Sequence, residues 1–203
     1  PFMKVFYNYE ITGKENLPTK AKSGKFIYTA NHVSIFDPPM VSMAAMRPIA
    51  YMAKKELFVD SEKLSWLVKR LGAFAVDRTK PEIATFKTVR DILATSWSLG
   101  VFPQGGIRPY GKLDEVKKGF VVIAKNAKAD IVPVGIEGFD GYPKLKPFTR
   151  RNVKLHIGKP ISYQLPEDEI IYQWGEQISK LAGYENCLPV PASRQSVKET
   201  VNT

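Results

Sequence analysis

The chain contains little cysteine and little histidine. Cys187 is the single cysteine among 203 residues, so neither a disulfide framework nor a cysteine-based metal site can be built. The two histidines, His32 and His156, lie far apart in the sequence and form no cluster with metal-ligand spacing. We therefore expect no metal and no other cofactor, and the sequence is compatible with a reducing compartment.

Long hydrophobic runs are also missing. The sequence has no stretch of about 18 or more apolar residues, so no segment of it is expected to cross a bilayer as a helix. A signal-peptide pattern is not visible either. The chain begins at Pro1 with a short apolar run that extends to Tyr7, which leaves open a membrane-binding segment upstream.

Acidic residues are outnumbered by basic ones. The chain has 30 Lys and Arg against 20 Asp and Glu, a net charge of +10, which suits nucleic acid, an anionic membrane or a phosphorylated substrate. Charge alone does not choose among these partners. With 44% hydrophobic residues, we expect one domain over residues 1–203, with a core at about 10–185 and a loose polar tail after residue 188.

Short apolar runs alternate with segments of helical periodicity. Strands are predicted at residues 26–30, 49–53, 73–76, 101–102, 131–136 and 153–157, and helices at 38–46, 60–71, 81–97, 114–127 and 167–183. Asp37 is expected to cap the first helix, and Gly100 to end the third. The alternation predicts an α/β fold with a mixed, largely parallel sheet flanked by helices.

Polar motifs follow four of the predicted strands. Asn31 and His32 follow the first, Lys54 ends the second, Arg78 follows the third, and residues 103–106 follow the fourth. In parallel sheets, the functional site lies beyond the carboxyl ends of the strands. We therefore expect these side chains to meet at one edge of the sheet.

The segment NHVSIFD, residues 31–37, indicates a specific chemistry. A neutral imidazole at His32 can take a proton from an attacking hydroxyl, which typically contributes ~10²–10⁴-fold in rate. Asp37, at a strand-to-helix turn, can accept a hydrogen bond from the other ring nitrogen and fix the tautomer. Spacing alone also allows a turn histidine followed by an ordinary helix cap. Ser34 lies on the same turn as His32 and is not expected to be a nucleophile.

Four ordered sequence blocks favour the catalytic interpretation of His32 and Asp37. Residues 31–37 match Asn-His-x4-Asp, residues 72–78 match a Gly-x-x-Phe/Ile-x-x-Arg block, residues 102–108 (FPQGGIR) correspond to Phe-Pro-Glu-Gly-Thr-Arg, and residues 132–134 match Val-Pro-Val. In these blocks, over roughly residues 26–140, the chain resembles the glycerophospholipid acyltransferase family. Bacterial members of that family make phosphatidic acid from 1-acylglycerol 3-phosphate.

The resemblance implies a role for each matching residue. His32 would be the general base, oriented by Asp37. Arg78 would bind the phosphate of the acceptor through its bidentate fork, and Lys54 would add positive charge there. The remaining substrate-binding residues implied by the blocks are Asn31, Gln104, Gly105, Gly106 and Arg108.

The third block departs from the family pattern. Gln104 stands where the family usually has Glu, and Ile107 stands at the usual Arg position, with Arg108 displaced by one. Gln keeps the size and an acceptor oxygen but loses the charge. The departure leaves open another acceptor, either a lysophospholipid with a different head group or another lipid alcohol.

The predicted function is O-acyl transfer. The donor would be acyl-CoA or acyl-carrier protein, the acceptor 1-acylglycerol 3-phosphate and the product phosphatidic acid. Nearby backbone donors would stabilise the oxyanion. A nucleic-acid-binding module is the alternative from another class, and we find neither the aromatic-basic interleaving nor the recognition helix that it needs, so nucleic acid is not an expected partner.

A membrane partner is also expected. The enzyme would lie on the cytoplasmic face of a membrane, held peripherally or by an upstream segment. Residues 58–71 mix aromatic, aliphatic and basic side chains, which suits a membrane interface, although a core-packed helix with a basic edge is equally compatible with the pattern.

Overall fold

The computed structural model describes residues 7–18, 25–59, 61–70, 72–76, 83–138 and 151–194. Within these ranges, seven strands form one sheet in the order β1-β8-β7-β2-β5-β3-β4. Five of them run parallel to one another: β2 (Lys25–Ala30), β3 (Ile49–Lys54), β4 (Ala73–Val76), β5 (Ser98–Val101) and β7 (Ala129–Glu137).

The remaining two strands run in the opposite direction. β8 (Arg151–Ile157) pairs antiparallel with β7, and β1 (Tyr7–Thr12) pairs parallel with β8. The predicted mixed, largely parallel sheet is therefore confirmed.

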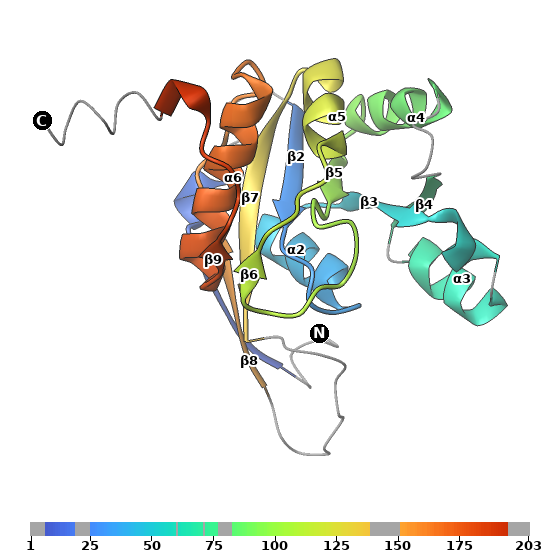
Figure 1. The fold of residues 1–203 in the computed structure, drawn as a ribbon. Coiled ribbons are helices and arrows are strands. Elements are labelled where there is room, and N and C mark those ends of the chain that lie inside the picture. Colours follow the sequence, from blue (N-terminus) through green and yellow to red (C-terminus); the bar gives the residue numbers. More distant parts are fainter. Residues whose placement is uncertain are drawn as a thin grey trace, which may run out of the picture.

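Helices cover both faces of this sheet. The α-helices are α2 (Asp37–Ala45), α3 (Glu62–Arg70), α4 (Ile83–Leu93), α5 (Gly119–Ala127) and α6 (Glu167–Ala182), and the 3-10 turns are η1 (Lys14–Asn16) and η2 (Lys55–Phe58). α5 and α6 contact each other and β7, and Figure 1 shows both in front of the sheet. The connections from β2 to β3 and from β5 to β7 cross the sheet in opposite directions, so right-handed crossovers place α2 and α5 on opposite faces.

The core lies on both sides of the central strands. β2 is buried from Phe26 to Ala30, and β7 is buried at every position except Asp130 and Glu137, because helices cover both faces of the two strands. Trp174 of α6 is completely buried, and its ring N–H donates to the Thr29 hydroxyl of β2 over 2.9 Å. This bond fixes α6 across the strand that leads to His32.

The helix predicted at residues 81–97 is shorter in the structure, and its expected stop is wrong. α4 ends at Leu93, and β5 begins at Ser98, three residues before the predicted strand. Gly100 lies inside β5, at a position that leaves no room for a side chain. A Cβ there would lie 2.3 Å from Cε1 of the Tyr51 ring.

Two other expectations about helix starts are corrected. The helix predicted at 114–127 begins at Gly119, because residues 114–117 form no helix and the Lys117 N–H donates instead to the Pro103 carbonyl over 2.8 Å. Asp37 is not the cap of α2. The helix begins at Asp37, with Phe36 at the cap position and prolines in the first turn.

A second, two-stranded sheet was not expected from the sequence. β6 (Lys112–Leu113) pairs in parallel with β9 (Glu185–Asn186), which follows α6. The Glu185 N–H donates to the Gly111 carbonyl over 2.7 Å, and the Cys187 N–H donates to the Leu113 carbonyl over 3.0 Å. The segment after α6 thus holds the loop that follows β5. Of the tail predicted after residue 188, residues 195–203 lie outside the described residues.

Candidate active site

The carboxyl ends of three neighbouring strands form the site. β2, β5 and β3 are adjacent and parallel, so they end at the same edge of the sheet. There they deliver His32, Lys54, and the loop of residues 102–118. β4 ends nearby at Val76, and Arg78, the predicted phosphate ligand, lies outside the described residues.

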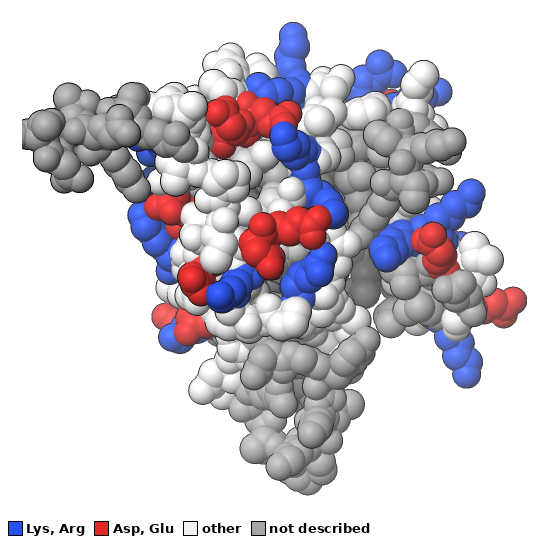
Figure 2. All heavy atoms as spheres, viewed as in Figure 1, with Lys and Arg blue, Asp and Glu red and all other residues white. Residues whose placement is uncertain are grey.

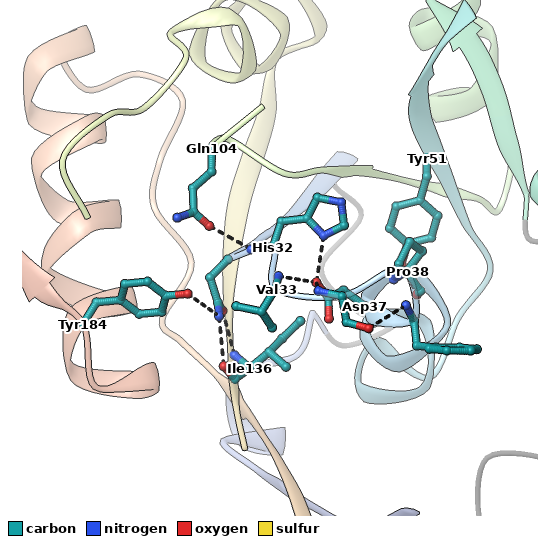
Figure 3. Close-up of polar contacts among 11 residues, drawn as sticks. His32, Val33, Asp37, Pro38, Tyr51, Gln104, Ile136 and Tyr184 are labelled. Atoms are coloured by element: carbon teal, nitrogen blue, oxygen red, sulfur yellow. Dashed lines mark hydrogen bonds and ion pairs between the residues drawn. The ribbon is translucent and has the colours of Figure 1, made fainter. Parts of the chain in front are cut away.

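His32 and Asp37 contact each other directly at this edge. The distance from His32 Nδ1 to Asp37 Oδ2 is 2.7 Å, with 17% of the His32 side chain exposed and none of the Asp37 side chain. Figure 3 shows the carboxylate below the ring and the other ring nitrogen, Nε2, turned away from it. Within the described residues, Nε2 has no hydrogen-bond partner.

The Asp37 carboxylate also fixes the turn that carries the histidine. Oδ2 accepts hydrogen bonds from the Val33 N–H over 2.7 Å and from the Ser34 N–H over 2.8 Å. Because Oδ2 already accepts two N–H groups, Nδ1 of His32 is the third donor, which leaves Nε2 as the proton acceptor of the neutral ring. Burial raises the pKa of the Asp37 carboxyl, while the bonds from His32, Ser34 and Val33 oppose this shift.

Aromatic rings support the imidazole from one side. The Phe102 ring stacks on the His32 ring with centroids 4.1 Å apart, and the Tyr51 ring follows Phe102 at 5.8 Å. The Tyr51 hydroxyl donates to the Pro38 carbonyl in the first turn of α2 over 2.7 Å. Burial raises the pKa of Tyr51, so this hydroxyl keeps its proton. Tyr51 thereby connects β3 to the helix that begins with Asp37.

The loop after β5 holds the backbone of His32 on both sides. The His32 N–H donates to Gln104 Oε1 over 2.8 Å, and the Arg108 N–H donates to the His32 carbonyl over 2.8 Å. Gln104 is only 3% exposed. Between them, Gly105 adopts a positive φ of 73°, which glycine tolerates without strain. Residues of the third block therefore contact the backbone of the histidine.

Asn31 is buried and faces β7 rather than solvent. Its side-chain amide donates to the Ile136 carbonyl over 2.9 Å and accepts from the Ile136 N–H over 2.8 Å. The amide nitrogen also lies 3.4 Å from the Tyr184 hydroxyl. Figure 3 draws this contact as a dashed line that starts at the Tyr184 hydroxyl. Burial raises the pKa of Tyr184 to about 12, so the hydroxyl stays protonated. Asn31 thus joins the ends of β2 and β7 beside the histidine.

The sequence that forms this site matches a known protein family. The model of the acyltransferase family matches residues 8–137, which include every residue of the candidate site named in this subsection except Tyr184. The chain belongs to the acyltransferase family. The predicted resemblance is confirmed, and the protein is an enzyme.

Individual relatives of this acyltransferase carry more specific names. The 1-acyl-sn-glycerol-3-phosphate acyltransferase of Bacillus subtilis (strain 168) is 33% identical over 153 residues, which cover 75% of this chain and 73% of the relative. The 1-acyl-sn-glycerol-3-phosphate acyltransferase of Streptococcus pneumoniae (strain ATCC BAA-255 / R6) is 34% identical over 139 residues, 67% of this chain but only half (50%) of the relative.

The fold is shared with a solved acyltransferase structure. The crystal structure of the 1-acyl-sn-glycerophosphate (LPA) acyltransferase PlsC from Thermotoga maritima superimposes with a TM-score of 0.62 at 24% sequence identity. The match covers 89% of this chain and 73% of that chain. This likeness establishes the α/β architecture.

The other predicted substrate residues within the described part of the acyltransferase differ in exposure. Lys54 is exposed at the end of β3, and a Cβ on Gly106 would meet open space within 4 Å. Arg108 is half-exposed and pairs with Glu115 at 3.4 Å. Tyr51 and Tyr184 were missed from the sequence, because a tyrosine in or beside an apolar run carries no sign of its hydroxyl partner.

The described part of the chain meets the requirements of neither a metal site nor a membrane-spanning helix. There, no group of three or more His, Cys, Asp or Glu side chains is placed to hold a metal ion. None of its helices has both the length and the apolar character needed to span a bilayer.

Proposed function

We propose that this enzyme transfers an acyl group from a thioester, acyl-CoA or acyl-carrier protein, to the hydroxyl of 1-acylglycerol 3-phosphate, giving phosphatidic acid. The observation that carries the proposal is the 2.7 Å contact between His32 Nδ1 and Asp37 Oδ2, with Nε2 turned away from the carboxylate. The names of two relatives that cover most of the chain support the acceptor.

The proposed chemistry needs a base and no protein nucleophile. Nε2 of His32 takes the proton of the acceptor hydroxyl while its oxygen attacks the thioester carbonyl carbon. The carbon–sulfur bond then breaks, and the leaving thiolate takes the proton back from the imidazolium. Asp37 holds the ring in the required tautomer and stabilises its positive charge between the two transfers.

The contact of Gln104 bears on which acceptor is used. Its amide oxygen accepts the His32 N–H, which a Glu carboxylate at this position could also do. We therefore propose that Gln104 positions the base and has no direct contact with the head group. On this basis, the replacement of Glu by Gln is no argument for a different acceptor. By the same reasoning, the buried Asn31 positions the base, while Arg78, Lys54, Gly105, Gly106 and Arg108 remain the proposed acceptor contacts.

We further propose that the enzyme associates peripherally with the cytoplasmic face of a membrane. At the end of the sheet that carries His32, α3 and the turn before it present Trp66, which is 63% exposed, and Val59, which is 75% exposed. The Arg70 guanidinium carbon lies 5.6 Å from the centroid of the Trp66 ring, and Lys63 and Lys69 are exposed on the same helix. An interfacial tryptophan among cations suits an anionic lipid surface.

A product assay with variants at the two central residues tests the proposed function. Wild-type enzyme and the His32→Ala and Asp37→Asn variants are incubated with an acyl thioester and 1-acylglycerol 3-phosphate, and products are identified by mass spectrometry. We expect kcat to fall about 10²–10⁴-fold in both variants while their unfolding temperatures stay near that of the wild type. Turnover by His32→Ala at the wild-type rate would refute the mechanism. Parallel assays with lysolipids of other head groups identify the alternative acceptors.

A further inference from the structure

Two cations on the loop after β5 share one carboxylate. Arg108 Nη2 lies 3.4 Å from Oε2 of Glu115, and Lys117 Nζ pairs with the other oxygen, Oε1. All three side chains are at least half-exposed. Figure 2 shows basic and acidic side chains next to one another on this face of the molecule, where Figure 1 places the segment that runs from β5 through β6 to α5.

Both cations are attached to the segment that holds the base. The Arg108 N–H bonds the carbonyl of His32, and the Lys117 N–H bonds the carbonyl of Pro103 over 2.8 Å. The stem of Lys117 lies over Gly105, where a Cβ would come within 3.2 Å of its Cγ. The position of the lysine therefore depends on the fold of residues 102–108, unlike that of a lysine on an open surface.

The carboxylate between the cations is held in its charged form. The hydrogen bond and charge of Lys117, and then the charge of Arg108, lower the pKa of Glu115. Because the groups are exposed, each pair is weak, and another anion can replace the carboxylate. A phosphate monoester offers more charge and three oxygens, which suits a guanidinium and an ammonium that now bind opposite oxygens of one carboxylate.

We propose that Lys117 and Arg108 together bind the phosphate of the acceptor, and that Glu115 occupies the place of that phosphate in the free enzyme. The proposal rests on the proposed function, because it assigns a further residue to the recognition of 1-acylglycerol 3-phosphate. Lys117 lies outside the four sequence blocks. It therefore adds a specificity-determining cation that the sequence blocks do not indicate.

The chain supplies a matched control for this cation. Lys118 is the next residue, but it pairs with Glu167 of α6 at 3.0 Å, away from the Arg108 pair. We expect Lys117→Gln to raise KM for 1-acylglycerol 3-phosphate roughly tenfold, the size of one lost charged hydrogen bond, with kcat nearly unchanged. KM for monoacylglycerol, which lacks the phosphate, stays unchanged. Lys118→Gln leaves both values as in the wild type.

Equal KM values in the Lys117→Gln and Lys118→Gln variants would overturn the proposal. A Lys117→Gln variant in which KM rises equally for 1-acylglycerol 3-phosphate and for monoacylglycerol would also overturn it, since the lysine would then support the fold of the loop. Unfolding temperatures of both variants distinguish a misfolded loop from a lost contact.

Binding of glycerol 3-phosphate provides a readout that does not depend on turnover. In calorimetric titrations, we expect the wild type and Lys118→Gln to bind this probe, with affinity that falls as salt is added, and Lys117→Gln to bind it about tenfold more weakly. If the wild type fails to acylate 1-acylglycerol 3-phosphate but shows this pattern, the proposed function is wrong and the phosphate site stands. If it acylates the lipid without this pattern, the phosphate site is wrong.

The role of Glu115 is tested separately. Because the carboxylate competes with the phosphate, Glu115→Gln is expected to tighten glycerol 3-phosphate binding a few-fold. Weaker binding by this variant would show that the carboxylate orients the cations and would overturn its role as a stand-in.

Discussion

The side-chain oxygen of Gln104 accepts a hydrogen bond from the backbone N–H of His32, so a buried amide positions the residue that we propose as the base. Glu in its place offers the same acceptor, whereas Met leaves the buried N–H without a partner, at a cost of about 1–3 kcal/mol. We expect Gln104→Glu to keep kcat and KM within a few-fold, and Gln104→Met to lower kcat about tenfold or more. Steady-state kinetics on the two variants measures this. Equal losses in both would mean that the amide has another role.

Gly100 makes room for the ring that follows Phe102 in the aromatic stack. A Cβ at this position would lie 2.3 Å from Cε1 of Tyr51, so we expect Gly100→Ala to reduce the free energy of unfolding by about 1–3 kcal/mol. Gly119 at the start of α5 is the control, because a Cβ there meets nothing within 4 Å. Urea unfolding should show Gly119→Ala at or above wild-type stability. A Gly100→Ala variant as stable as the wild type would contradict the packing described here.

The exposed tryptophan of α3 is expected to contact lipid. Trp66→Ser should reduce co-sedimentation with vesicles that contain phosphatidylglycerol several-fold, and high salt should weaken binding of both proteins, because it screens the cations of the helix. Trp97 is the matched control, since it is 43% exposed but precedes β5, at the opposite edge of the sheet from His32. Equal loss of binding in Trp66→Ser and Trp97→Ser would argue against α3 as the contact surface.

The end of the described chain is tied to α6 by an ion pair whose strength depends on pH. Arg194 donates to both carboxylate oxygens of Glu169, over 2.6 and 2.9 Å, and its hydrogen bonds lower the pKa of Glu169. A lowered carboxyl pKa adds stability above the pKa of the unfolded state, and this stability is lost as pH falls through the pKa of the folded state. We expect Arg194→Gln to unfold at a slightly lower temperature than the wild type at neutral pH, since exposed ion pairs contribute little to stability.

That difference should disappear at acidic pH. Thermal unfolding of both proteins, from neutral pH down to the lowest pH at which the wild type stays folded, measures it. A difference that persists after Glu169 is protonated would show that Arg194 stabilises the chain by packing, for example against the Tyr172 ring 4.9 Å from its guanidinium carbon.

The strands around the site could be predicted because each combines a local apolar run with a polar motif directly after it. β2 and β3 were found in this way, and so was the pairing of His32 with Asp37. β1 could not be found, because its partner β8 lies about 140 residues away and nothing in the local sequence indicates that pairing. Gly100 was misplaced because the reason for a glycine there is the ring of Tyr51, a tertiary contact.

The functions of polar residues were harder to predict than their positions. Gln104 and Asn31 were expected to contact substrate, yet the structure directs both side chains to backbone groups of neighbouring segments. Lys117 is one of two adjacent lysines, and the sequence around it carries no sign of its contact. Its proximity to Arg108 arises from the turn of residues 102–118, which depends on the pairing of β6 with a strand more than 70 residues later.

The pairing of β6 with β9 has a consequence for how this enzyme can be divided. The match to the acyltransferase family ends at residue 137, yet the strand that supports the loop of Gln104 and Arg108 lies beyond Gly183. A fragment cut at the family boundary would keep His32 and Asp37 and lose the backbone partners of Gly111 and Leu113. Substitutions after α6 can therefore alter acyl transfer without touching the lipid, and chimeras between relatives should exchange residues 102–118 and 184–188 together.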